Sequence, residues 1–170
     1  MRLAVISDIH GEYFALDHML QDIQRQGIEQ IVCLGDALQG GSQPAETLAR
    51  LRELNCPVVM DNADAWLITG QQTSEGEEPI EQQRAVRAWS LAQLSASDIA
   101  YVQQFPPTIN IPLEAGNNLL CYHGSPRSFD EIILPDTPDD VVRQFLSGYN
   151  ATLFTIGHTH TQQMRRLGNS

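Results

Sequence analysis

The chain has 170 residues, of which 42% are hydrophobic and 18% are charged, and its formal net charge is −11 at pH 7. This length predicts a single domain over residues 1–170, and the acidic balance disfavours nucleic acid as a partner. No apolar run approaches the roughly 20 residues of a membrane helix, and three cysteines without a CxxC pair are typical of buried free thiols in a cytoplasmic protein.

The first sixty residues alternate predicted strands with predicted helices. Short apolar runs at 3–6, 31–34 and 58–60 predict buried strands. Helical spacing predicts one helix that ends near Gly27 and a second that begins at Pro44. This β-α-β-α-β order is typical of a mainly parallel sheet covered by helices.

The rest of the chain predicts a more mixed pattern. Residues 70–79 are polar and predict a loop, and residues 80–104 predict two helices around Ser95. A helix capped by Thr137 is predicted to run to about Ser147. Further strands are predicted at 108–113, 118–122, 152–156 and 162–167.

Polar residues follow the predicted strands at the points where the strands end. Asp8 and His10 follow the first strand, and Asp36 follows the second. Later strands are followed by His123 and by the pair His158 and His160. Because sites in open α/β sheets form at the carboxyl ends of strands, these side chains are expected at one edge of the sheet. A single histidine there is weak evidence, but the joint occurrence predicts a metal site.

These blocks resemble the calcineurin-like metallophosphoesterases. The resemblance rests on Asp8-Ile9-His10-Gly11, Gly35-Asp36, Asn62, His123-Gly124-Ser125-Pro126 and Gly157-His158-Thr159-His160, and it is similar in detail to the small bacterial members. It implies an α/β fold, an αββα sandwich of two mixed β-sheets flanked by helices. It also implies a site for two metal ions between the loops of the sheets.

The resemblance further implies which residues hold the metal ions. One ion is expected on Asp8, His10, Asp36 and His160, and the other on Asp36, Asn62, His123 and His158. Imidazoles combined with carboxylates favour Mn²⁺, with Fe or Zn²⁺ as alternatives. Asp36, Asn62 and His123 are expected at the catalytic centre, where a metal-bridging hydroxide attacks the phosphorus of a small-molecule phosphate ester.

Five residues outside this ligand set have more than one interpretation. Arg127 either binds the substrate phosphate or forms a surface salt bridge. Asp64 either orients a ligand histidine or caps the helix that follows it. Trp66 and Trp89 are expected in the core, with a platform for substrate as the alternative, and His18 is expected to be structural or at the surface.

The block Asp61-Asn62-Ala63-Asp64 departs from the family pattern, which commonly reads Gly-Asn-His-Asp or Gly-Asn-His-Glu. Ala63 stands where many relatives carry a histidine thought to protonate the leaving group. We therefore expect slow turnover of alkyl phosphates and better rates on aryl esters. Asp61 replaces a glycine, so we expect an unusual backbone angle there and added negative charge beside the metal ions.

The end of the chain is a second departure, because relatives commonly continue through further strands, whereas ten residues follow His160 here. We expect a second sheet that lacks C-terminal strands and leaves an open edge. The edge is either paired in a homo-oligomer, which light scattering would detect, or the polypeptide is shortened.

Hydrolysis of a phosphodiester or a phosphomonoester is the function that the complete ligand set predicts. The alternative is a protein-binding scaffold on the same fold with weak or no catalysis, which Ala63 mildly favours. A nuclease is disfavoured by the charge of the chain. A protein serine/threonine phosphatase is disfavoured because its longer signatures are missing.

Overall fold

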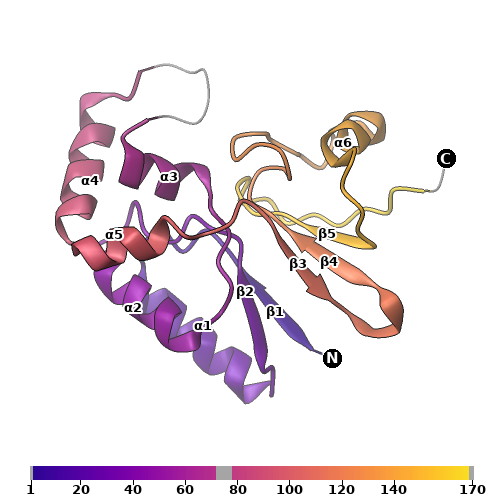
Figure 1. The fold of residues 1–170 in the computed structure, drawn as a ribbon, viewed down its shortest axis with the longest axis horizontal. Coiled ribbons are helices and arrows are strands. Elements are labelled where there is room, and N and C mark those ends of the chain that lie inside the picture. The colour runs from indigo at the N-terminus through magenta and orange to yellow at the C-terminus, as the bar shows by residue number, and fades with distance from the viewer. Residues whose placement is uncertain (1, 72–77, 169–170) are drawn as a thin grey trace.

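Figure 1 shows the computed structural model of the chain, which describes residues 2–71 and 78–168. In chain order the elements are β1 (Leu3–Ile6), α1 (Tyr13–Arg25), β2 (Gln30–Cys33), α2 (Pro44–Leu54), α3 (Asn62–Thr69), α4 (Glu81–Ala92), α5 (Ala96–Val102), β3 (Ile109–Pro112), the 3-10 helix η1 (Glu114–Gly116), β4 (Asn118–Cys121), α6 (Asp139–Leu146) and β5 (Leu153–Thr155). Most of the loop predicted at 70–79 lies outside the described residues.

The five strands form two small sheets. In the first sheet β1 pairs in parallel with β2, so that Ile6 lies opposite Cys33. In the second sheet β4 lies in the middle, antiparallel to β3 and parallel to β5. The apolar run at 58–60, predicted as a third strand, instead makes a single parallel bridge from Val58 to Cys33. The parallel sheet is therefore narrower than the sequence predicts.

The two sheets pack face to face. Side chains alternate between the two faces of each strand, so one face of a sheet contacts the other sheet while the opposite face contacts helices. Cys33 of β2 belongs to the core beneath α1 and α2. The adjacent Val32 packs against Leu119 and Cys121 of β4. Leu120, between these two, packs against α6 on the far side. The predicted αββα sandwich is confirmed: helices cover the outer face of each sheet (Figure 1).

The helices form where periodicity predicts them. The spacing of Leu16 and Ile23 places both on the buried face of α1. Ser95 separates α4 from α5 and caps α5, because its side chain accepts a hydrogen bond from the backbone in the first turn. The expected core position of Trp89 is wrong, since this residue is 43% exposed, while Trp66 is half-buried.

The segment 162–167 contains no strand, which corrects the prediction. Its Arg165 instead donates hydrogen bonds of 2.6–2.7 Å to the carbonyl oxygens of Leu134, Pro135 and Thr137. The prediction that Thr137 caps α6 is wrong, because Pro138 precedes the helix and Thr137 Oγ1 instead accepts a hydrogen bond from Leu134 N–H at 2.8 Å. A strand needs a neighbour for its ladder of hydrogen bonds, and this segment pairs with no strand among the described residues.

Among the described residues β5 pairs with β4 alone in the order β3-β4-β5, which leaves its other edge without a neighbouring strand. Leu153 of β5 is 53% exposed. Pairing of this edge in a homo-oligomer stays a prediction. None of the helices among the described residues has the length and hydropathy that crossing a membrane requires.

Candidate metal centre

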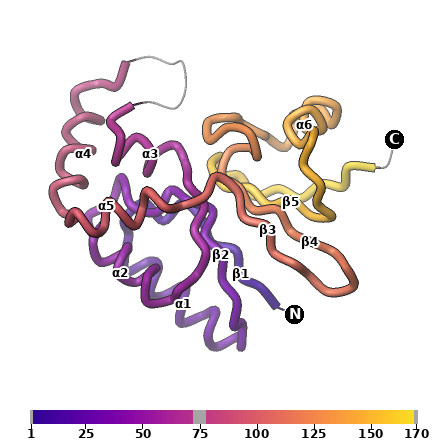
Figure 2. The backbone as a smooth tube through the Cα atoms, viewed as in Figure 1, coloured from indigo at the N-terminus to yellow at the C-terminus, as the bar shows by residue number. Residues whose placement is uncertain are grey.

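Polar residues from four strand ends come together in two adjacent groups. One candidate ligand atom from each of Asp8, His10, Asp36 and His160 lies within 4.8 Å of the others, and Asp36, His123 and His158 form a second such group. These residues follow β1, β2, β4 and β5, whose continuing segments meet near the centre of the molecule (Figure 2). Asp36 belongs to both groups, so its carboxylate lies where a bridging ligand is expected.

The distances within each group are short enough for one cation. In the first group, His160 Nε2 lies 3.1 Å from Asp8 Oδ1 and 3.4 Å from His10 Nε2. His10 Nε2 also lies 3.6 Å from Asp36 Oδ2. In the second group, His123 Nε2 lies 3.5 Å from the same Asp36 oxygen. The second contact of His123 Nε2 is to Nδ1 of His158, at 3.1 Å.

Backbone carbonyl groups fix the tautomers of two of these histidines. His10 Nδ1 lies 2.9 Å from the carbonyl oxygen of Gln39, and His123 Nδ1 lies 2.8 Å from that of Leu34. A carbonyl oxygen can only accept, so both Nδ1 atoms carry the proton and the Nε2 atoms present a lone pair. Each lone pair faces another imidazole nitrogen at 3.1–3.4 Å. Such an arrangement needs a proton or a cation between the nitrogens.

Several buried side-chain oxygens make no hydrogen bond among the described residues, and two of them, Asp36 Oδ1 and Asn62 Oδ1, belong to expected metal ligands. An unpaired buried polar atom costs about 1–3 kcal/mol, and a cation would relieve that cost. Asn62, the seventh expected ligand, is the first residue of α3 and directly follows Asp61, whose side chain lies against Gly35. These oxygen and imidazole donors fit divalent transition-metal ions.

Backbone strain is concentrated in the same residues. Among the described residues seven non-glycine residues have a positive φ, and five of these are Asp8, His10, Asp36, His158 and His160. Left-handed backbone is uncommon for residues other than glycine, and it clusters at functional sites because the surrounding structure must enforce it. This clustering independently marks the two groups as a functional centre.

The charges of the site keep its central carboxylate ionised. Burial alone would raise the pKa of Asp36, but its interactions with the neighbouring His123 and Asp61 side chains outweigh burial and hold that pKa well below its ordinary value. Burial lowers the pKa of His158, and the neighbouring His123 lowers it further. Asp36 is therefore an anion and His158 a neutral base near neutral pH, which are the protonation states that bind metal ions.

Comparison with known families agrees with this geometry. The family model for the calcineurin-like phosphoesterase superfamily domain matches residues 1–170. The chain belongs to this superfamily.

Individual relatives of this phosphoesterase domain are longer than the chain. The uncharacterized protein MJ0912 of Methanocaldococcus jannaschii is 30% identical over 164 residues, which cover 93% of this chain and 62% of that protein. A metallophosphoesterase from Sphaerobacter thermophilus superposes with a TM-score of 0.72 at 27% identity, covering 94% of this chain and 61% of its own. The hypothetical protein PH1004 from Pyrococcus horikoshii has the same fold, with a TM-score of 0.70, 22% identity, and coverage of 85% of this chain and 63% of its own. The chain thus spans about three fifths of the length of these relatives.

Asp64 has a role in the phosphoesterase domain that differs from both predicted ones. Asp64 does not cap α3, and none of its hydrogen bonds among the described residues goes to a ligand histidine. Its carboxylate accepts 3.0 Å hydrogen bonds from the backbone N–H groups of Ala37 and Leu38, directly after Asp36. The cap is Asp61, which accepts a hydrogen bond from Asp64 N–H at 2.8 Å. Asp64 therefore holds the turn that gives Asp36 its positive φ.

Replacing Asp64 with alanine is expected to loosen this turn. It leaves the backbone donors of Ala37 and Leu38 buried without an acceptor, so we expect a loss of about 2–4 kcal/mol in the free energy of unfolding. We also expect Mn²⁺ affinity to fall about 10- to 100-fold, as for other residues that orient metal ligands. Chemical denaturation and Mn²⁺ titration measure the two effects.

The exposed Asp22 provides the matched control for this substitution. Asp22→Ala is expected to leave both quantities near the wild-type values, and Asp64→Asn, which keeps one acceptor oxygen, is expected to lie between. Wild-type Mn²⁺ affinity in Asp64→Ala would show that Asp36 does not depend on this clamp.

The sequence gives little signal for the groups that support the site. Leu34 and Gln39 act through backbone carbonyl oxygens, which any residue type offers. Asp61 was visible as a departure from the family pattern, but its backbone is extended, with φ −136°, so the expected unusual angle is wrong. Burial raises the pKa of Asp61 well above its ordinary value, and the charges of Asp64 and Asp36 add to this effect.

Of the remaining predicted residues, Arg127 forms an ion pair and His18 lies at the surface. The Arg127 guanidinium donates to both carboxylate oxygens of Glu131 at 2.8 and 3.0 Å. His18 is exposed, and its ring nitrogen Nδ1 hydrogen-bonds to the carbonyl oxygen of Phe14 in the same helix. Binding of a substrate phosphate by Arg127 stays a prediction.

Proposed function

We propose that this domain hydrolyses small-molecule phosphate esters with the help of two divalent metal ions. One ion would be held by Asp8, His10, Asp36 and His160, and the other by Asp36, Asn62, His123 and His158. The observation that carries the proposal is the position of Asp36, whose carboxylate is shared by two groups of candidate ligands. Two bound ions supply an activated water and neutralise the charge that develops on the phosphate.

The protein's own residues prepare the site for these ions. Interactions with the neighbouring His123 and Asp61 side chains keep Asp36 ionised, and backbone carbonyl groups aim Nε2 of His10 and His123 inward. This set of imidazoles and carboxylates favours Mn²⁺, with Fe or Zn²⁺ as alternatives. Phosphodiesters and phosphomonoesters are both candidate substrates.

The first turn of α3 bears on the choice of substrate. Ala63 lies next to Asn62 in this turn and has no group that can protonate a leaving alcohol. General-acid assistance is worth about 10²–10⁴-fold, so the domain is expected to depend on good leaving groups. Aryl esters should therefore be cleaved faster than alkyl esters.

The state of the three cysteines bears on the cellular compartment of the domain. All three are buried and free, and burial raises the pKa of the Cys56 thiol to about 11 and of the Cys121 thiol to about 12. Such thiols are unreactive and suit a reducing environment. We place the domain in the cytoplasm on this basis.

The experiment is a metal-dependent assay on an ester panel. Protein freed of metal with EDTA is expected to be inactive towards bis-p-nitrophenyl phosphate, and two equivalents of Mn²⁺ are expected to raise the rate at least about 100-fold. The same panel compares p-nitrophenyl with alkyl esters, and elemental analysis gives the bound metal.

His123→Ala and the surface variant His18→Ala form a matched pair in this assay. The first is expected to lose hydrolysis and the second to keep it. Binding of two metal ions without hydrolysis of any ester would favour the scaffold function instead. Equal rates on aryl and alkyl esters would contradict the role given to Ala63.

A further inference from the structure

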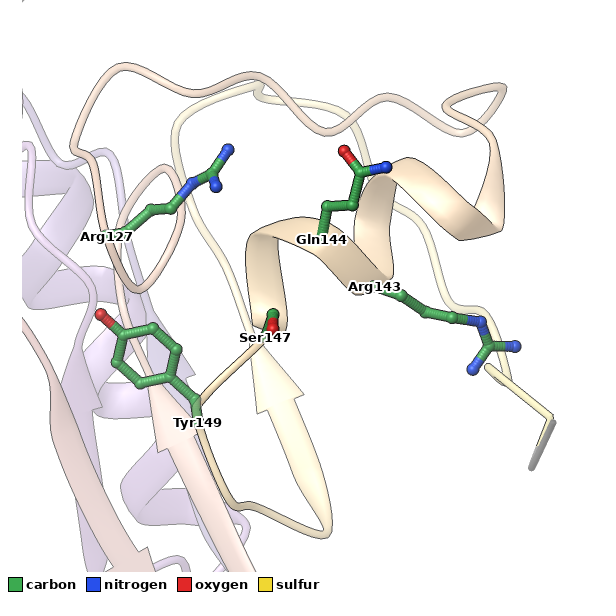
Figure 3. Close-up of a pocket in the computed structure, with 5 residues that line it drawn as sticks. All are labelled: Arg127, Arg143, Gln144, Ser147 and Tyr149. Atoms are coloured by element: carbon green, nitrogen blue, oxygen red, sulfur yellow. The ribbon is translucent and has the colours of Figure 1, made fainter.

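A second polar pocket lies beside α6, outside the two ligand groups. It has a volume of about 690 Å³ and is lined by Arg127, Arg143, Gln144, Ser147 and Tyr149. Figure 3 shows Arg127 and Tyr149 on one side of this pocket and Gln144 and Ser147 of the α6 segment on the other. The Arg143 guanidinium points away from Arg127, so Arg143 contributes mainly its aliphatic stem.

Arg127 is held rigidly with one edge of its guanidinium free. Its Nε–H donates to both oxygens of Glu131, and its Nη2 lies 2.6 Å from Glu131 Oε1. The guanidinium also stacks 4.8 Å from the ring centroid of Phe145. A guanidinium has five N–H donors in a fixed plane, and Glu131 occupies only the Nε edge. The Nη1–Nη2 edge keeps N–H groups that pair with nothing among the described residues.

The other walls of the pocket add polar groups without partners. The side chains of Gln144 and Ser147 make no hydrogen bond with another described residue. Tyr149 donates its hydroxyl to the carbonyl oxygen of Pro126 at 2.8 Å, which fixes this wall to the turn that carries Arg127. A planar Arg edge with nearby amide and hydroxyl donors suits an oxyanion, which accepts several hydrogen bonds at once.

The pocket is connected to the candidate metal centre by a short, closed turn. Arg127 is the fourth residue after His123, and four residues span at most about 14 Å. Ser125 closes the turn, because its Oγ accepts from the N–H groups of Arg127 and Ser128 at 3.2 and 3.1 Å. A group attached to a phosphate ester bound at the metal ions is therefore within reach of the pocket.

We propose that this pocket binds a second oxyanion, a phosphate or a carboxylate, on the leaving group of the substrate. The proposal rests on the proposed function and narrows it to phosphate esters that carry a second anionic group. In a chain with 10 basic and 21 acidic residues, most of the surface would repel such a substrate. The rigid Arg127 edge gives the distal anion a local attractive site.

The kinetic test uses bisphosphates of linear diols with two, four and six carbons, each compared with the monophosphate of the same chain length. The wild-type, Mn²⁺-loaded domain is expected to favour one bisphosphate about 10- to 100-fold in kcat/KM, mainly through KM. Arg127→Gln and the double variant Gln144→Ala/Ser147→Ala, which keeps the Glu131 pair, are expected to bring this ratio towards one. Arg25→Gln, which removes an exposed cation elsewhere, is the matched control and should keep the ratio.

A binding test separates this proposal from the proposed function. Inorganic phosphate is titrated by calorimetry into protein kept free of metal with EDTA, where the metal centre contributes no hydrolysis. Binding that Arg127→Gln weakens about tenfold or more, and Arg25→Gln does not, supports the oxyanion site even if no ester is cleaved. Hydrolysis without a preference for any bisphosphate, or phosphate binding that is equal in all variants or absent from the wild type, overturns the proposal.

Discussion

Replacing Asp36 with asparagine is expected to remove both metal ions and to lower kcat/KM for phosphate ester hydrolysis at least about a thousandfold. Asp36 is the residue shared by the two ligand groups, and an amide has neither the charge nor the second acceptor oxygen of a carboxylate. The charge stabilisation that metal ions give to hydrolysis is worth several kcal/mol, and each 1.36 kcal/mol is a factor of ten in rate.

Elemental analysis and steady-state kinetics measure this effect together. Asp22→Asn makes the same chemical change at an exposed position and is expected to keep both metal ions and full activity. Unfolding of both variants in EDTA separates loss of metal from loss of fold. Two bound metal ions in Asp36→Asn, with activity near that of the wild type, would show that this carboxylate does not bridge.

The parts of the fold that depend on local patterns were predictable from the sequence. Helix α1 shows apolar residues at helical spacing, and α2 begins with Pro44 at its first turn, so both helices follow from short-range rules. The sandwich and the order of the polar blocks followed from a resemblance that extends over the whole chain. The structure brings six of the seven expected ligands into two groups that share Asp36, because each block directly follows a strand.

The parts that depend on contacts through space were not predictable. Segment 162–167 is predicted as a strand, but Arg165 hydrogen-bonds to carbonyl groups of a loop that is distant in the sequence. Asp64 could be assigned to a histidine or to a helix cap, and only the fold shows that it holds the turn after Asp36. The positive φ of the candidate ligands has only a weak signature in residue type, because aspartate and histidine are enriched in left-handed backbone but most of them are right-handed or extended.

Gly35 and Asp61 show how closely the support of the site is packed. Gly35 precedes Asp36, has a φ of +96°, and an added Cβ would lie 2.6 Å from Cβ of Asp61 and 2.7 Å from its Oδ2. Burying a carboxyl at position 61, where relatives commonly have glycine, is thus compatible with the fold only because residue 35 has no side chain. The two positions are expected to be energetically coupled.

Gly35→Ala is therefore expected to destabilise the domain by about 2–5 kcal/mol, the sum of about 1–2 kcal/mol of backbone strain and about 1–3 kcal/mol of overpacking. Gly27→Ala is the matched control, because Gly27 has a φ of +65° and nothing within 4 Å of an added Cβ. Gly27→Ala should be destabilised by backbone strain alone, and denaturant unfolding of both variants measures the difference in the free energy of unfolding. In the double variant Gly35→Ala/Asp61→Gly the clash is absent, so the loss should fall short of the sum of the single losses by about 1–3 kcal/mol. Equal losses for Gly35→Ala and Gly27→Ala, or additivity in the double variant, would mean that the Asp61 carboxyl can move aside and is not fixed against the residue that precedes Asp36.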